Sequence, residues 1–262
     1  MEGRSWGLSS KGTHKIVRVM VGENFSASRL VVIGQEKDLE EFLRAHVREG
    51  MVGLFGGSSW THRLVRKGQR PLTKKGKSSL WSHAVIFGQE DGQMVVYESD
   101  WDVGIRPFRF NVGAQKNPLG KYSGGRRWSY VALLDLGLGE EQRDLLMEAC
   151  REIIREGYRY SVLELVNHGL RLRLRGKAGY LLKATELLGR IGQELGLRRP
   201  SFYCSAFVQK AMEEAGFNLG DSATNLAPQE IFHLSQVKIC YLREKEWRAL
   251  LELGEMRLEE RA

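Results

Sequence analysis

The feature that most constrains the fold of this chain is a pair of apolar, strand-forming runs joined by a short glycine-containing turn. The runs cover residues 80–87 and 93–99, and the connecting residues 88–92 end in Asp-Gly. An Asp-Gly pair between two such runs is typical of a β-hairpin. Apolar residues occupy both faces of both runs, as in strands buried within a sheet. We therefore expect an antiparallel hairpin at the centre of the fold.

The rest of the chain predicts further strands around this hairpin and helices outside it. Additional strand-like runs lie at residues 14–20, 29–33, 52–55, 129–136 and 237–242. Helical spacing of apolar residues predicts helices at residues 38–48, 139–156, 203–215 and 245–261. Strands that cluster together, with helices set apart, favour an α+β fold with an antiparallel sheet over an alternating α/β fold.

The length of the chain favours one main folded unit. Its 262 residues, 42% of them hydrophobic, suffice for one sizeable core. We interpret residues 1–49 as an N-terminal β/α extension and residues 50–262 as the main domain. Residues 163–200 combine a basic alternation with a predicted helix at 178–195, and we interpret them as a basic, helical insertion. Because the insertion directly precedes the candidate site described below, we expect it to form a lid.

The net charge of +8 and the pI near 9.4 predict attraction to anionic partners. Nucleic acid, phospholipid head groups, anionic polymers and carboxylate substrates all remain open on charge alone. The basic residues concentrate at positions 63–77, which we expect to be a loop, and at positions 171–177 in the insertion. A solvated, solubilising rim is an equally good interpretation of both segments.

Membrane-spanning and secretory segments are not expected. The longest apolar stretches fall short of the roughly 20 residues that a membrane helix needs, and residues 1–12 lack the apolar core of a signal peptide. The three cysteines are too few and too scattered for a disulfide framework or a zinc site, and their odd number leaves a free thiol. A cytoplasmic, reducing location is the simplest expectation.

Cys204 stands at a position that can activate a thiol. An apolar stripe from Phe207 to Ala215 predicts a helix whose first turn contains Cys204. The start of a helix stabilises a thiolate through the helix dipole and its unpaired N–H groups. Cysteines are nevertheless more often small core residues, as we expect for Cys150 on the apolar face of residues 139–156. Position alone leaves Cys204 open to both interpretations.

His83 and Glu98 lie in the two strands of the central hairpin. If Phe87 pairs with Met94 across a six-residue connection, His83 lies opposite Glu98 on the same face of the sheet. The two Cβ atoms would then be about 4.5–5.5 Å apart, so the carboxylate could orient the imidazole. A slip of one residue would place them on opposite faces. The alternative is a satisfied core histidine beside a solvated glutamate.

Several segments together resemble a known family. The segments are SHAVI at residues 82–86, VYE at 96–98, GYRYS at 157–161, YCSAFV at 203–208 and APQE at 227–230. In this order they resemble the circularly permuted papain-like families. These comprise the YiiX-like members of the NlpC-type cysteine peptidase superfamily and their lecithin-retinol-acyltransferase-like relatives.

The resemblance, which covers roughly residues 50–245, implies a circularly permuted papain-like fold in which an antiparallel sheet packs against the nucleophile helix. It implies that Cys204 is the nucleophile, His83 the general base and acid, and Glu98 the residue that orients His83. The thiolate would attack an acyl carbonyl, and the imidazole would protonate the leaving amine and then activate water against the thioester. The backbone N–H of Cys204 would be an oxyanion donor. This chemistry requires no metal and no other cofactor.

The leading hypothesis is therefore a cysteine-dependent amidase or peptidase that hydrolyses a small peptide or amide, with cell-wall-type peptides implied by the resemblance. The first alternative is an acyltransferase, thioesterase or phospholipase acting on an anionic lipid, for which the basic segments and residues 178–195 are suited. The second is a non-catalytic binding module on the same fold. Nucleic acid is the less favoured partner.

Overall fold

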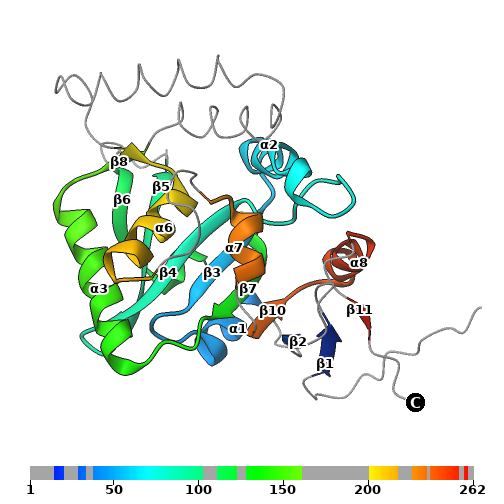
Figure 1. The fold of residues 1–262 in the computed structure, drawn as a ribbon, viewed down its shortest axis with the longest axis horizontal. Coiled ribbons are helices and arrows are strands. Elements are labelled where there is room, and N and C mark those ends of the chain that lie inside the picture. The colour runs from blue at the N-terminus through cyan, green and yellow to red at the C-terminus, as the bar shows by residue number, and fades with distance from the viewer. Residues whose placement is uncertain are drawn as a thin grey trace, which may run out of the picture.

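The computed structural model describes residues 15–20, 29–33, 38–102, 111–122, 128–160, 201–217, 226–234, 237–253 and 257–258 (Figure 1). The strands are β1 (Lys15–Met20), β2 (Arg29–Ile33), β3 (Val52–Gly57), β4 (His83–Glu90), β5 (Gln93–Asp102), β6 (Asn111–Pro118), β7 (Trp128–Asp135), β8 (Arg159–Tyr160), β9 (Ser201–Phe202), β10 (Val237–Tyr241) and β11 (Arg257–Leu258). The helices are α1 (Leu39–His46), α2 (Trp60–Gly68), α3 (Glu140–Arg155), α6 (Cys204–Glu214), α7 (Pro228–Leu234) and α8 (Glu244–Glu252), with 3-10 turns η1 (Arg70–Leu72) and η2 (Leu119–Tyr122).

One large sheet organises these elements. Its strands lie in the order β11-β1-β2-β10-β7-β3-β4-β5-β6, and β8 pairs separately with β9. Within the large sheet, only the β2–β10 pair is parallel among the described strands. The six strands from β10 to β6 thus form a continuous antiparallel sheet. The predicted α+β class with an antiparallel sheet is confirmed.

Helices cover both faces of this sheet. On one face α6 lies over β4 and β5 (Figure 1), where Phe207 and Val208 pack against Ala84 and Ile86. On the other face α1 contributes Phe42 to a second apolar cluster. Side chains alternate between the two faces along each strand, so neighbouring residues of one strand belong to different clusters. His83 and Glu98 belong to the face that carries α1.

The register of the central hairpin differs from the expected one by two residues. Glu90 pairs with Gln93, so the loop is the two-residue Asp91-Gly92 turn rather than a six-residue connection, and Phe87 faces Val96 instead of Met94. Asp91 and Gly92 both have positive φ, 49° and 75°, as a type I′ turn requires. The expected pairing of Phe87 with Met94 was wrong. A shift of two residues nevertheless keeps every side chain on its expected face.

Two further segments differ from expectation. The basic segment at 63–77, expected to be a loop, contains most of α2 and all of η1. The closing helix, expected over 245–261, ends at Glu252, and the chain continues to a short strand, β11, that pairs with β1. The predicted helix at 178–195, and with it the expected lid, lies outside the described residues.

The N-terminal strands join the main sheet directly. The strands expected at 14–20 and 29–33 form the antiparallel pair β1–β2, and β2 pairs with β10. The division into a 1–49 extension and a 50–262 domain stays a prediction. None of the helices that the structure describes is long and apolar enough to cross a bilayer.

Gly56 allows β3 to approach Tyr130 of the neighbouring β7. A Cβ atom added at Gly56 would lie 1.8 Å from the Tyr130 ring. The Tyr130 hydroxyl donates to the Leu80 carbonyl at 2.9 Å and accepts from Arg66 Nη1 at 2.5 Å. The absence of a side chain at Gly56 therefore lets one tyrosine link the sheet to α2.

We predict that Gly56→Ala lowers the free energy of unfolding by about 1–3 kcal/mol, because overpacking forces the tyrosine ring to move. Urea titration followed by circular dichroism measures the change. As a control, Gly139→Ala should change stability by less than about 1 kcal/mol, since the nearest atom to its added Cβ lies 3.7 Å away. Equal effects of the two substitutions would show that the close approach at Gly56 does not limit stability.

Candidate active site

Cys204 is the first residue of α6. Its neighbour Tyr203 has extended backbone angles (φ −95°, ψ 170°) and serves as the N-cap, so the chain enters the helix at the cysteine. The side chain is only 3% exposed. The N–H groups of a helix's first turn lack partners within the helix and carry the positive end of its dipole. Cys204 therefore lies where negative charge is stabilised.

His83 connects Cys204 with Glu98. Its Nε2 atom lies 2.6 Å from Oε2 of Glu98, and the charge of Cys204 and hydrogen bonding with its side chain are among the influences that raise the pKa of His83. Because Glu98 engages Nε2, Nδ1 is the nitrogen left for the sulfur. All three side chains are buried. The structure thus brings together the three residues that the sequence indicated.

The hydrogen bond between His83 and Glu98 forms in spite of the shifted register. If the observed pairing of β4 with β5 is extended, the residue opposite His83 is number 100. Glu98 is therefore two residues away from the position opposite His83, which makes the two side chains diagonal neighbours. Diagonal neighbours on one face remain within reach of long side chains. Glu98 spans this extra distance, and a carboxylate oxygen of Asp100 lies within 4.8 Å of the ligand atoms of His83 and Glu98.

Both carboxylate oxygens of Glu98 are hydrogen-bonded. Oε2 accepts from His83 Nε2 and from the Tyr122 hydroxyl. Oε1 accepts from Asn117 Nδ2 and from Lys121 Nζ, each at 2.7 Å. A carboxylate with several donors keeps its charge even where burial disfavours it. Glu98, with no exposed surface, is therefore held in one orientation as an anion.

Lys121 forms ion pairs with two carboxylates at once. Its Nζ atom lies 2.7 Å from Oε1 of Glu98 and 2.9 Å from Oδ2 of Asp100. His83, Glu98 and Asp100 offer ligand atoms within 4.8 Å of one another, and they are the described residues grouped closely enough to hold a metal ion. The lysine ammonium already supplies positive charge to both carboxylates.

The neighbours of His83 favour its protonated form. Burial lowers the pKa of His83. The charge of Cys204, hydrogen bonding with Cys204, the hydrogen bond to Glu98 and the charge of Asp100 all raise it, and together they outweigh burial, so the pKa of His83 rises to about 10. Burial also opposes ionisation of Glu98, but the hydrogen bond and charge of His83 hold the pKa of Glu98 below its usual value.

Two aromatic rings fix the plane of the imidazole. The rings of Trp128 and Tyr122 lie nearly parallel to His83, with centroids 5.3 Å and 6.3 Å away and interplanar angles of 26° and 17°. Tyr122 in turn contacts Phe55 at 4.2 Å between centroids. The histidine is thus oriented by stacking as well as by hydrogen bonds.

Sequence reasoning missed four members of this cluster: Asn117, Lys121, Tyr122 and Asp100. The first three lie on β6 and η2, and the segment NVGAQKNP of β6 has no apolar alternation from which a strand could be predicted. Asp100 could have been found, because it lies two residues after Glu98 and therefore shares its face of the strand.

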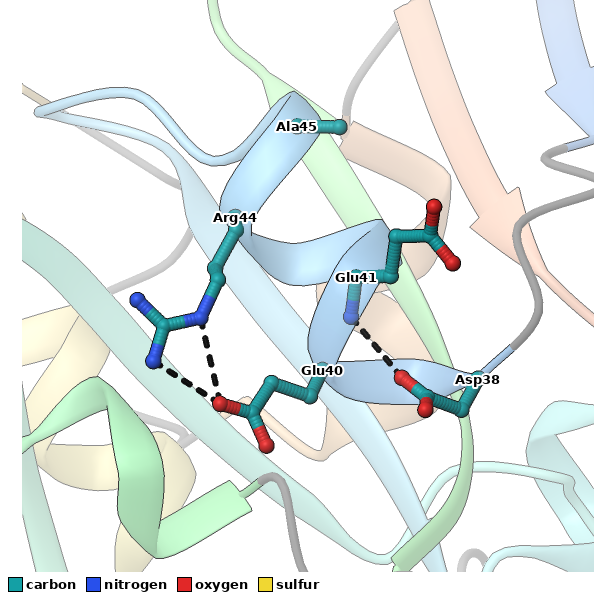
Figure 2. Close-up of a pocket in the computed structure, with 5 residues that line it drawn as sticks. All are labelled: Asp38, Glu40, Glu41, Arg44 and Ala45. Atoms are coloured by element: carbon teal, nitrogen blue, oxygen red, sulfur yellow. Dashed lines mark hydrogen bonds and ion pairs between the residues drawn. The ribbon is translucent and has the colours of Figure 1, made fainter.

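A surface pocket lies elsewhere, over α1 (Figure 2). It is lined by Asp38, Glu40, Glu41, Arg44 and Ala45. Asp38 caps α1 by accepting from the Glu41 backbone N–H at 2.9 Å, and Arg44 pairs with Glu40 at 2.8 Å. The pocket shares no residue with the Cys204 cluster, and its polar groups serve the helix itself.

A scan against protein-family models finds no family that matches this chain, and a search among curated proteins finds no match either. The geometry of the buried cluster is therefore the basis on which a function can be assigned.

We predict that NMR titration of His83 shows an imidazolium up to about pH 10 in the wild-type chain. Cys204→Ala and Glu98→Gln should each lower this midpoint towards the ordinary histidine pKa of 6.5, because each removes a partner of the imidazolium. Glu40→Gln, on the surface of α1, should leave it unchanged. A wild-type midpoint near 6.5 would contradict the assigned interactions.

The same raised pKa predicts how stability depends on pH. A histidine whose pKa is raised in the folded state contributes its full stability below the unfolded value of 6.5, and this contribution is lost as pH approaches 10. The free energy of unfolding should therefore fall between these pH values. In Glu98→Gln the total fall should be smaller, because a lower folded-state pKa of His83 ends the decline at a lower pH. Urea titrations across this range measure the total fall in both chains, and equal falls would exclude coupling between His83 and Glu98.

Proposed function

We propose that this chain is a cysteine-dependent amidase or peptidase of circularly permuted papain-like fold, which hydrolyses a small peptide or amide through a thioester. One observation carries the proposal: the buried imidazole of His83 is hydrogen-bonded to Glu98 and interacts electrostatically with Cys204, the buried first residue of a helix. A nucleophile, a base and a residue that orients the base are the parts that covalent acyl transfer needs.

The first chemical step uses Cys204 and His83. The Cys204 thiolate adds to the acyl carbonyl, and the oxyanion forms beside the first turn of α6, where the Cys204 backbone N–H is the natural donor. His83 then gives its proton to the departing amine as the tetrahedral intermediate collapses to a thioester. The buried imidazolium is suited to this step, since its neighbours favour the protonated form.

The second step releases the acyl group. His83, now neutral, removes a proton from water, and the resulting hydroxide attacks the thioester carbonyl. Collapse of this second intermediate expels the Cys204 thiolate and restores the imidazolium–thiolate pair. Glu98 keeps the histidine in the tautomer that directs Nδ1 towards sulfur, and Lys121 and Tyr122 hold the Glu98 carboxylate in place.

An enzyme acting on esters would use the same three groups. The geometry of the cluster is equally compatible with thioesterase, phospholipase or acyltransferase chemistry. Peptide amides are the leading substrate class in this proposal, and parallel assays on acyl esters test the alternative.

We predict that iodoacetamide at neutral pH modifies Cys204 much faster than Cys150 or Cys240. Burial raises the pKa of the Cys150 thiol, and it raises the pKa of Cys240 to about 12, so these thiols remain protonated. A time course of peptide mass mapping on the native chain gives the three rates. His83→Ala should slow labelling of Cys204 and leave the other two rates unchanged. This result would show that the fast labelling comes from activation of the thiol by His83 and not from better access of the reagent. Equal rates at all three cysteines would favour a non-catalytic binding module.

We predict a fixed order of activity among variants in a screen of peptide amides and acyl esters. Cys204→Ala should abolish turnover, since no nucleophile remains. His83→Ala should nearly abolish it, and Glu98→Gln should retain at least about tenfold more activity than His83→Ala, because it loses orientation without losing a reacting group. Wild-type turnover by Cys204→Ala would refute the cysteine-hydrolase mechanism.

A further inference from the structure

Helix α2 carries an exposed stripe of alternating apolar and basic residues. Trp60, Arg63, Leu64 and Lys67 follow the spacing i, i+3, i+4, i+7, which places them on one face of the helix. Trp60 is 71% exposed and Leu64 is 56% exposed, the highest values among the large apolar side chains in the described residues. Two such side chains one turn apart form a patch rather than isolated surface residues.

The charged residues in and around α2 are all basic. Residues 58–78 contain seven Lys and Arg residues and neither Asp nor Glu. Arg66 is bonded to Tyr130, Arg70 to Ser78 and Lys77 to Glu252. The four other cations, all exposed, have no acidic partner among the residues that the structure describes, namely Arg63, Lys67, Lys74 and Lys75. The face therefore joins two apolar side chains with uncompensated positive charge.

The opposite side of α2 is fixed to the candidate active site. The His62 ring lies 4.7 Å from Trp128, the residue whose ring stacks on His83. Arg66 donates to the Tyr130 hydroxyl, and Gln69 Nε2 donates to the Trp81 carbonyl at 2.8 Å. Figure 1 shows α2 beyond the end of β3, apart from α3 and α6. The inner side of α2 is thus linked through Trp128 to His83, and the exposed face lies on the outer side of the same helix.

We propose that the outer face of α2 docks on an anionic lipid membrane. Trp60 and Leu64 enter the boundary between head groups and acyl chains, and the four cations contact lipid phosphates. A nucleic acid would match the charges but would leave the two apolar side chains in water, so the composition of the face favours lipid. This docking goes beyond the proposed hydrolysis and does not depend on it. If the chain is also a hydrolase, docking holds its reactive centre beside the membrane surface.

Vesicle sedimentation tests the docking without turnover. The full chain carrying Cys204→Ala is mixed with vesicles of phosphatidylcholine alone, or of phosphatidylcholine with phosphatidylglycerol. We expect binding to the anionic vesicles only. Arg63→Gln with Lys67→Gln should weaken it by about fivefold per residue removed, and Trp60→Ser with Leu64→Ser by roughly tenfold.

Matched substitutions on α3 provide the controls. Arg151→Gln with Arg155→Gln removes the same charge from an exposed helix, and Leu145→Ser removes an apolar side chain that is 51% exposed. Both controls should bind vesicles like the parent chain, and circular dichroism checks that all variants are folded. Failure to bind anionic vesicles, or equal weakening by the α3 controls, would overturn the proposal. So would α2 variants that lose affinity for a DNA or RNA duplex while vesicle binding is unchanged.

Discussion

The rest of the candidate site depends on the buried carboxylate of Glu98. A carboxylate without exposed surface is strongly destabilising unless donors replace the water that it has lost. Here Asn117 and Lys121 bind one oxygen, and His83 and Tyr122 bind the other. The hairpin that carries Glu98 and His83 therefore requires β6 and η2 beside it. Lys121 also compensates Asp100, so one cation allows two acidic groups to lie next to the histidine.

This arrangement explains how charge is organised at Cys204. The anion at Glu98 and the stacked rings of Trp128 and Tyr122 fix one edge and the plane of the imidazole. Cys204, at the start of α6, adds to the influences that raise the pKa of this imidazole. The helix start favours negative charge, and the anionic neighbours of His83 favour positive charge on its ring. The two preferences reinforce each other across the Cys204–His83 contact.

The sequence was sufficient for the parts of this site that follow periodic patterns. The Asp-Gly turn and two apolar runs predicted the hairpin. The predicted register was wrong by two residues, but an even shift keeps each side chain on the same face, so His83 and Glu98 were still correctly placed on one face. The polar strand β6 and the single turn η2 could not be predicted, because neither has an apolar period. Helix α2 was also missed. It has no buried apolar face, because Trp60 and Leu64 are exposed, and its many basic residues are typical of a loop.

The central claim is that Cys204 forms a covalent acyl intermediate, and acid quenching of a reaction with p-nitrophenyl acetate tests it most directly. Peptide mass mapping of the quenched wild-type chain should find an acetyl group on the peptide that contains Cys204 and none on those containing Cys150 or Cys240. His83→Ala should greatly reduce this adduct, since the imidazole no longer supports the thiolate. Acetylation confined to other residues, with Cys204 unmodified, would contradict the account.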